Sequence, residues 1–445
     1  MAFMQDGNNL LVCSMVHERD MRFATDDEIL NTVRRLAAYK QTDTKKVFLL
    51  RQQAFGFRHE PHNMLLDDSL AGILKPASQF MHDWMHGWVA NGVFNTTFYL
   101  VLETLEAEGL TDIYERMGNY FSTLHFPART KLAYAALFSA KHRDSNRKAQ
   151  TFKCSASEAL GIYPVFAHYL KVAVLRNPEC TEKLTNACKA FVSLESCLDA
   201  LQSIPYGNVD ANEFRILTNS FLDLMLINNW KDWLHPKFHW VVHLPRELEF
   251  FGFLVTCWVH ERKHKVVKQY ATDIRNTIVF ERSLLSEVVC HQLEEIRRQE
   301  CFSFKVGLLT PHRAPARVEA FLVSNAGLTD AIMTSAYARI SSGICTRKDI
   351  AIISNGSTVS VGEVLLHVEH RDQCLSLVKF LELRSYDHAA SAIDIGTSSP
   401  SLCMVETADI LCSVIWATTA RGIKVLVPGR FRAHFTCKPS SSSSV

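Results

Sequence analysis

The sequence predicts a mainly α-helical protein with a small β-rich, barrel-like domain near the C-terminus, and therefore an α+β fold overall. Apolar residues recur at helical spacing through most of the chain, to about residue 335. Beyond residue 340 the pattern changes to short runs rich in β-branched residues, separated by Gly, Asn, Asp and Ser. The composition is that of a globular protein, since 47% of the 445 residues are hydrophobic and 21% are charged.

The first predicted helix covers residues 25–40 and begins at a capping box. Thr25 is followed three residues later by Glu28, a spacing at which each side chain can bond to the backbone amide of the other residue. "LKPASQF" predicts the start of the next helix, with Pro76 in its first turn. A charged connector at 139–150 and a turn with Pro and Gly at 204–212 interrupt the helices that follow.

The C-terminal strands are predicted from five runs that together form a small antiparallel barrel or meander of about 95 residues. The final segment, "CKPSSSSSV", is of low complexity and predicts a disordered tail. The five runs are "DIAIISN", "EVLLHVEH", "QCLSLVKFLEL", "LCMVETADILCSVIWA" and "IKVLVPGRF".

Charge and cysteine usage exclude several classes of protein. The formal net charge is only +2, so nucleic-acid binding would need a local basic patch. The 13 cysteines are scattered without a C-x-x-C pair, which predicts reduced thiols in an intracellular protein and argues against a Cys-rich zinc site. No run of about 18 apolar residues occurs, so no membrane span is predicted.

The stretch "QFMHDWMHGWVANGV", residues 79–93, places an acid and two histidines among tryptophans and methionines. Taken as a helix with 100° per residue, it puts Asp83, His86, Gly87 and Ala90 on one narrow face. Two interpretations are open. Asp83 and His86 form a simple hydrogen-bonded pair on the helix edge, or they belong to a site for a metal ion or for phosphate chemistry.

A second stretch, "FLVTCWVHERKHKVVKQYATDI", predicts a helix with one strongly charged face. Glu261, His264, Lys265 and Lys268 fall on that face, and apolar residues fall on the opposite one. The pattern is typical of a solvated face with an i,i+4 pair of Glu261 and Lys265. It is also compatible with a carboxylate that binds a divalent ion beside cations that bind phosphate.

The preceding "HPKFHWVVHLPRELEFF" is dense in histidine. "FHWVVHL" alternates as a strand does, with His239 and His243 on one side, and this predicts histidines that lie in the core or support a neighbouring site. A helical interpretation would put His235, His239 and His243 on one face, the arrangement of a zinc hydrolase. Pro236 and Pro245, which flank the run, disfavour the helix.

"HDWMHGWVANGV" and "PKFHWVVHLPRELEFFGFLVTCWVHERKHKVVK" together resemble the C-terminal half of CACTA-like cut-and-paste DNA transposases, DDE/D enzymes with a ribonuclease-H-like catalytic core. The resemblance extends over about residues 10–300. It implies that Asp83 and His86 are the D-x-x-H motif of the active site. It further implies that Glu261 is the last catalytic acid, which binds Mg²⁺ or Mn²⁺.

The same resemblance implies roles for the residues around Glu261. His264, His239 and His243 would support the active site. DNA phosphates would be contacted by four cations, whose signature is salt-dependent binding. These are Arg262, Lys263, Lys265 and Lys268.

The residue patterns and the resemblance together give a domain plan. Residues 1–140 would be a remnant of the transposase core with the D-x-x-H helix. Residues 151–335 would be a helical domain that carries the H-E-R-K-H helix. Residues 340–435 would be the β-rich domain, and 436–445 the disordered tail.

The chain departs from the family in one respect that decides its expected activity. DDE chemistry needs three acids around two divalent ions, and the family places the first two on strands before D-x-x-H. Only 82 residues precede Asp83, and they contain no convincing strand pair with such acids. We therefore expect a transposable-element-derived, intracellular and nuclear protein that is catalytically incomplete. We expect it to bind DNA, and self-association is a further expectation. We expect no interaction with a membrane.

The alternative from a different class is a helical interaction module with a β-barrel reader of peptides or nucleic acid, without catalysis. It predicts that Asp83 and Glu261 share no cleft, whereas the transposase interpretation predicts that they lie together.

Overall fold

The computed structural model describes residues 5–6, 9–10, 24–70, 72–127, 134–274, 279–297, 305–329, 331–396, 401–420 and 422–436, with backbone alone for 5–6, 9–10, 259–265 and 436. The chain forms two compact units, each built from several segments. The helical unit comprises 1–110, 145–160 and 179–257, and the mixed unit comprises 111–144, 161–178 and 258–445. Within the described part of the chain, no helix is both long and apolar enough to span a membrane.

The two units interleave along the chain, and the predicted division into successive domains stays a prediction. The segment 161–178 belongs to the mixed unit because it bonds to the β-rich part. His168 Nδ1 lies 2.9 Å from the carbonyl oxygen of Ala390, and Arg176 donates to Asp387 at 2.6 Å. The predicted disordered tail lies, beyond Thr436, outside the described residues.

The helical unit begins with the predicted capping box. The Glu28 amide donates to Thr25 Oγ1 at 3.2 Å, and the Thr25 amide donates to Glu28 Oε2 at 2.9 Å. Thr25 is the N-cap of α1 (Asp26–Thr42), and the prediction is confirmed. Helix α2 (Lys45–Phe55) follows, and the apolar side chains that α1 and α2 bury are Ile29, Leu30, Val33, Leu36 and Phe48.

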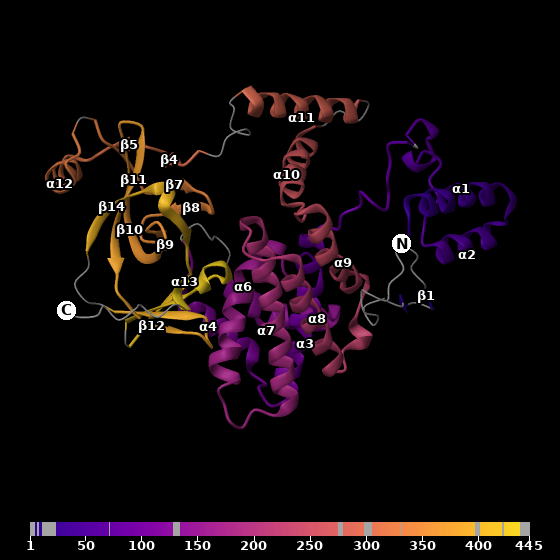
Figure 1. The fold of residues 1–445 in the computed structure, drawn as a ribbon, viewed down its shortest axis with the longest axis horizontal. Coiled ribbons are helices and arrows are strands. Elements are labelled where there is room, and N and C mark those ends of the chain that lie inside the picture. Colours follow the sequence, from indigo (N-terminus) through magenta and orange to yellow (C-terminus); the bar gives the residue numbers. More distant parts are fainter. Residues whose placement is uncertain are drawn as a thin grey trace. The chain divides into compact units, whose positions relative to one another are not determined.

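Four helices of the helical unit lie side by side as a bundle (Figure 1). They are α3 (Val93–Ala107), α7 (Glu182–Ser203), α8 (Ala211–Ile227) and α9 (Pro236–Phe251). Aromatic rings fill the space between them: Phe98 lies 4.2 Å from Phe152 and 5.2 Å from Phe191, centroid to centroid. This close packing fixes the position of the turn that precedes α3.

Short helical elements connect the bundle. The helix predicted to open at Pro76 is absent from the described residues there, where 76–79 form a turn. The remaining elements are η3 (Met64–Leu66), η4 (Asp68–Leu70), η5 (Met85–Val89), η8 (Ile204–Tyr206) and η9 (Lys231–Trp233).

The predicted connector at 139–150 is helix α5 (Ala140–Ala149) instead. Its polar sequence folds because its C-terminal turn has long-range partners. Arg147 pairs with Glu106 and Glu103, and buried Asn146 accepts a hydrogen bond from the Lys153 amide at 2.9 Å. Helix α6 (Ala156–Tyr169) follows and continues into η7 (Leu170–Val174).

The mixed unit contains further helices around its β-rich part. Among these, α10 carries the H-E-R-K-H sequence. They are α4 (Ile113–Ser122), η6 (Tyr134–Phe138), α10 (Trp258–Asp273), α11 (Phe280–Arg297), α12 (Ala316–Ala326), η10 (Thr407–Asp409), η11 (Gly429–Phe431) and α13 (Arg432–Thr436).

All described strand pairs are antiparallel, and all five predicted runs form strands. The α+β prediction is confirmed. The strands of the five runs are β9 (Ile350–Ser354), β10 (Val359–His370), β11 (Gln373–Leu381), β14 (Leu402–Glu406), β15 (Ile410–Ser413), β16 (Trp416–Thr419) and β17 (Gly422–Leu426). The others are β1 (Gln5–Asp6), β2 (Asn9–Leu10), β3 (Leu124–His125), β4 (Gly307–Leu309), β5 (His312–Arg313), β6 (Met333–Ser335), β7 (Tyr337–Ile340), β8 (Gly343–Thr346), β12 (Leu383–Asp387) and β13 (Ala392–Ile395).

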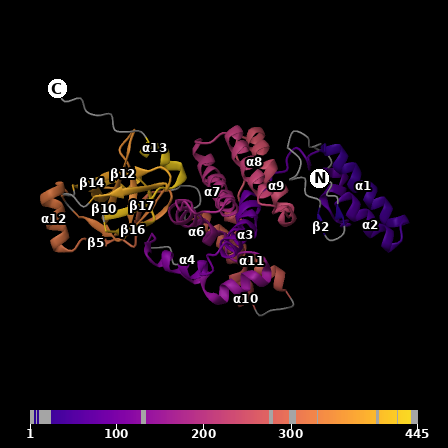
Figure 2. The same cartoon turned by 90° about the horizontal axis from the view of Figure 1, so that it is seen from below.

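Two sheets enclose the main core of the β-rich part. A seven-stranded sheet runs β14-β11-β10-β6-β5 with β9 and β15 attached, and a five-stranded sheet runs β12-β13-β17-β16-β3. Ile352 and Val361 of the first pack with Ile393 and Val425 of the second. Helix α12 lies at one edge of these strands (Figure 2), where Leu322 packs on a smaller core. A third sheet runs β4-β7-β8.

Candidate functional site

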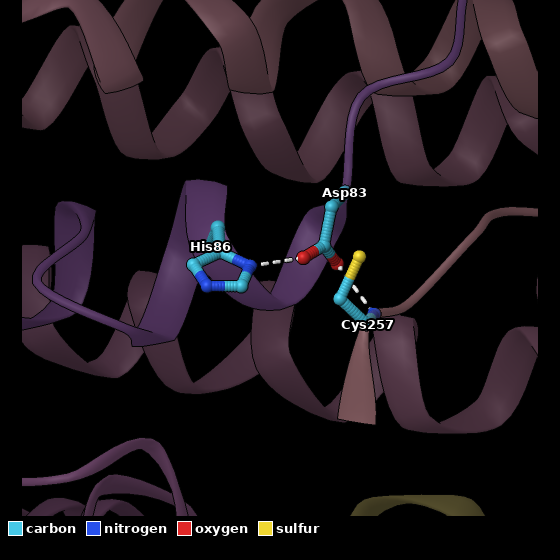
Figure 3. Close-up of side chains that lie close together, drawn as sticks. All are labelled: Asp83, His86 and Cys257. Atoms are coloured by element: carbon cyan, nitrogen blue, oxygen red, sulfur yellow. Dashed lines mark hydrogen bonds and ion pairs between the residues drawn. The ribbon is translucent and has the colours of Figure 1, made fainter. Parts of the chain in front are cut away.

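Asp83 lies at a tight turn directly before η5, and all of its carboxylate is engaged. Asp83 Oδ1 accepts hydrogen bonds from the Met85 amide at 3.0 Å and from the Cys257 amide at 3.1 Å. Asp83 Oδ2 is bonded to Nδ1 of His86 (Figure 3). The side chain of Asp83 is only 14% exposed, while that of His86 is 40% exposed. The carboxylate is therefore fixed in orientation, and the imidazole beside it faces solvent.

The turn is tied to the segment that leads into α10. The Trp84 amide donates to the carbonyl oxygen of Val255 at 3.3 Å, in addition to the bond between Cys257 and Asp83. Cys257 is the last residue before α10 begins at Trp258. The structure therefore brings the D-x-x-H motif to the segment that precedes the H-E-R-K-H helix.

Most of the residues on α10 that were predicted to bind metal or DNA lie in the part of the helix whose side chains are not described. Glu261 belongs to the first turn of α10, so its backbone is helical as predicted. Whether its carboxylate reaches Asp83 stays a prediction. Lys268 is exposed and lies on the same helix. The predicted residues whose side chains lie outside the described part are Glu261, Arg262, Lys263, His264 and Lys265.

The described residues contain one group of three potential metal ligands. The donor atoms of Asp83, His86 and Cys257 all lie within 4.8 Å of one another, and Figure 3 shows Asp83 between the other two. Mg²⁺ and Mn²⁺ prefer oxygen ligands. An imidazole and a thiol beside a single carboxylate fit these ions poorly, so we assign no step of magnesium chemistry to this group.

The backbone of this turn is unusual, because η5 is a π-helix rather than the α-helix that the sequence predicted. One extra residue per turn moves the residue positions away from the 100° spacing, and π turns are frequent at functional sites. Met85, Trp88 and Val89 of η5 are buried, and Trp88 packs against Phe221 with ring centroids 5.6 Å apart. Of the predicted polar face, the side chains of Asp83 and His86 come together, and the Gly87 amide donates to the Asp83 carbonyl oxygen.

Gly92 permits the close approach of α3 to η5. We expect Gly92→Ala to lower the free energy of unfolding by about 1–3 kcal/mol, because an added Cβ would lie 2.4 Å from the Gly87 oxygen and 2.7 Å from the Trp88 carbonyl carbon. Both atoms belong to the backbone, so the turn itself must move.

Gly87→Ala is the matched control in the same turn. Its Cβ would meet only Val241 Cγ1, at an ordinary 3.5 Å, and we expect a change below about 0.5 kcal/mol. Urea unfolding of both variants measures the difference, and equal effects would contradict the proposed contact.

A buried polar network holds the residues just before Asp83 against α9. Glu247 accepts from the His82 amide at 2.9 Å and contacts His82 Nδ1 at 2.5 Å. The His82 ring stacks on His243, with centroids 5.3 Å apart. His243 Nε2 in turn lies 3.0 Å from His239 Nε2. Both histidines predicted to have a supporting role therefore join a network that contacts the neighbour of Asp83 in the chain.

Burial determines the charge of these histidines. Loss of hydration, with a smaller contribution from the nearby His82, lowers the pKa of His239 to about 4. Loss of hydration, His239 and His82 lower the pKa of His243 to about 3. Both are therefore neutral near pH 7, and one can donate to the other across their Nε2 atoms.

A partly buried cation also lies near the turn. Lys237 Nζ donates to the Ala90 carbonyl oxygen at 2.7 Å. Burial lowers the pKa of Lys237, and the Asp83 carboxylate partly offsets that shift. The Asp83 side chain therefore acts electrostatically on α9 as well as on its hydrogen-bond partners.

The predicted strand "FHWVVHL" is wrong, because these residues belong to α9. Pro236 occupies the first turn of the helix, where its missing N–H costs nothing. Pro245 lies within the helix. His235 caps the helix: its Nδ1 accepts from the Lys237 amide, and its Nε2 lies 3.1 Å from Thr96 Oγ1. The three imidazoles of the zinc-hydrolase alternative are thus not gathered as one ligand set.

Sequence reasoning missed Cys257, His82 and Glu247. Cys257 stood within the quoted motif segment, four residues before Glu261, but a single cysteine has no spacing signal. Glu247 is the last residue of "LPRE" and has the pattern of an ordinary helical acid. His82 and Glu247 meet only because α9 packs beside residue 82, and Cys257 reaches Asp83 through the segment that leads into α10.

Comparison of the chain with protein-family models, with curated proteins and with solved structures finds no match. The resemblance to CACTA-like transposases therefore depends on the D-x-x-H and H-E-R-K-H motifs themselves, and it stays a prediction.

Proposed function

We propose that this chain is a transposable-element-derived protein that binds duplex DNA and is catalytically incomplete on its own. The observation that supports it most is the junction at Asp83. Two motif segments carried the resemblance, and they meet through the bond from the Cys257 amide to Asp83 Oδ1, although 174 positions separate the two residues. A chance likeness in two unrelated segments gives no reason for such a junction.

The DNA contacts are assigned to α10. The helical backbone of Trp258–Asp273 puts positions 262, 265 and 268, which are spaced by three residues, along one side of the helix, and position 263 lies about 100° beyond 262. Cations at such positions neutralise successive phosphates and release condensed counterions. In this proposal the ancestral Mg²⁺ or Mn²⁺ is not bound by this chain alone. The proposal also places the protein in the nucleus and includes its association with further copies of itself.

Binding to a duplex of random sequence at several salt concentrations tests the proposal. We expect log Kd to rise steeply with log salt, because about four phosphate contacts give a slope near 4. Neutralising the four cations should reduce that slope by about 2–4. The variant is R262Q/K263Q/K265Q/K268Q.

The matched control removes the same number of charges from exposed lysines on α2 and α5, and it should leave the slope near the wild-type value. The absence of DNA binding, or a slope that α10 does not influence, would favour the non-catalytic interaction module with a β-rich reader instead. The control variant is K45Q/K46Q/K141Q/K148Q.

A further inference from the structure

We propose that Asp83, His86 and Cys257 form a binding site for a divalent transition-metal ion of the zinc class. The donors come from two places far apart in the chain: the turn at η5 supplies Asp83 and His86, and the segment before α10 supplies Cys257. Their donor atoms nevertheless lie within 4.8 Å of one another. This site does not depend on DNA binding and concerns a different ion from the ancestral Mg²⁺ or Mn²⁺.

The donor types select the class of metal. Thiolate and imidazole suit Zn²⁺ and its neighbours, whereas Mg²⁺ requires oxygen ligands. One carboxylate and one thiolate carry two negative charges, which balance a divalent cation. Zinc sites with three protein ligands hold water or an external ligand at the fourth tetrahedral position.

The distances require only a small adjustment. Bonds of about 2.0–2.3 Å in a tetrahedral zinc site place ligand atoms roughly 3.3–3.8 Å apart. The thiol must approach from within 4.8 Å. Asp83 Oδ2 and His86 Nδ1 are hydrogen-bonded to each other, and hydrogen-bonded atoms lie closer together than two ligands of one ion. A metal ion that replaces the proton of this hydrogen bond would separate them to the required distance.

The backbone around the donors is already ordered, which lowers the entropic cost of binding. The His82 amide is bonded to Glu247, the Trp84 amide to Val255, and the Gly87 amide to the Asp83 carbonyl oxygen at 3.0 Å. Asp83 Oδ1 keeps its two amide donors, and Oδ2 is the atom that would bind the metal. The exposed edge of His86 gives the ion a path from solvent.

The test uses the full chain after treatment with a chelator. We expect dialysis against Zn²⁺ to give one tightly bound ion per chain. Co²⁺ in its place should give a sulfur-to-cobalt charge-transfer band and the intense visible spectrum of a tetrahedral site. Loss of a ligand should weaken zinc binding at least about 100-fold, since loss of a merely supporting partner costs 10- to 100-fold.

Three single variants and one control separate this site from adventitious binding by other cysteines and histidines. Cys257→Ser keeps the backbone amide of residue 257 that donates to Asp83. Asp83→Asn keeps a side-chain oxygen that can accept from that amide, so both variants should fold. His86→Gln is the third variant. Cys290→Ser removes an exposed thiol elsewhere and should retain the ion and the band.

Circular dichroism and urea unfolding establish that each variant is folded. The proposal is overturned if the wild type binds no zinc. It is also overturned if folded C257S and H86Q bind zinc as the wild type does, or if millimolar Mg²⁺ displaces the ion. The proposed DNA binding is measured without added metal, so either proposal can fail while the other stands.

Discussion

Acidification from about pH 7 to about pH 5 is expected to lower the free energy of unfolding of the helical unit by about 2–4 kcal/mol. The cause is the pair His239 and His243, which is buried as neutral imidazoles. Burial lowers the pKa of His239 to about 4 and that of His243 to about 3, from an ordinary value of 6.5. The unfolded chain therefore takes up protons before the folded chain does.

The direction of the effect follows from proton uptake. Between about pH 6.5 and the folded pKa values, the unfolded state binds more protons, so stability falls as pH falls. The contribution is fully present above pH 6.5 and is lost progressively toward pH 4 and then pH 3. A pH of 5 is about 1.5 units below the pKa of each histidine in the unfolded chain. Each histidine therefore lowers the free energy of unfolding by about 2 kcal/mol, at 1.36 kcal/mol per unit. The 3.0 Å contact between the two rings couples the two contributions, so their sum is an upper value.

Urea unfolding at a series of pH values measures this dependence, and replacement of the pair tests its origin. His239→Leu with His243→Phe should flatten the profile between pH 7 and pH 5, whereas His62→Gln, at an exposed position of the same unit, should leave it unchanged. An NMR titration of the wild-type imidazoles gives a second measurement if the double variant is unfolded. Protonation of either ring above about pH 5.5 would refute the explanation.

Local signals in the sequence predicted local structure well. The capping box of Thr25 and Glu28 needs only residues three apart, and it forms as predicted. The five β-rich runs likewise form strands, because each is a short run rich in β-branched residues that is bounded by turn-forming residues. The pairing of those strands was not predicted. Strand β3 is two residues long and joins β16, where His125 stacks on Trp416 at 4.0 Å.

The error in α9 has a physical cause. Phe238, Val241, Val242 and Leu244 are all buried, and they occupy more than one face of the helix. A helix buried on several sides loses the one-sided period of 3.6 residues, so a short apolar run resembles a strand. The prolines reinforced this interpretation, although a proline at the first turn is typical of a helix start.

The candidate site was predictable only in part, for the same reason. Asp83 and His86 are three residues apart, so their contact is local and the sequence indicated it. Cys257 and Glu247 reach the same turn through contacts over 174 and 165 positions. Such contacts depend on how η5, α3 and α9 pack, and a single sequence does not encode that packing in any short pattern.

The bond between Glu247 and His82 is expected to be the most costly polar contact to remove in the helical unit. Glu247→Leu should lower the free energy of unfolding by about 3–5 kcal/mol, because two buried donors lose their acceptor at once. These are the His82 backbone amide and His82 Nδ1. Leucine has nearly the volume of glutamate, so packing changes little. Glu247→Gln keeps one acceptor oxygen and should cost about half as much.

The controls lie two residues further along the same helix. Glu249 is 63% exposed on its side chain and pairs with Arg215 at 2.6 Å. Glu249→Leu and Glu249→Gln should each change the free energy of unfolding by less than about 1 kcal/mol, since an exposed ion pair contributes little. Similar losses for the two positions would show that α9 does not hold residue 82 through this carboxylate. A large loss at Glu247 alone, accompanied by weaker zinc binding at Asp83, would show that the buried network also positions the metal ligands.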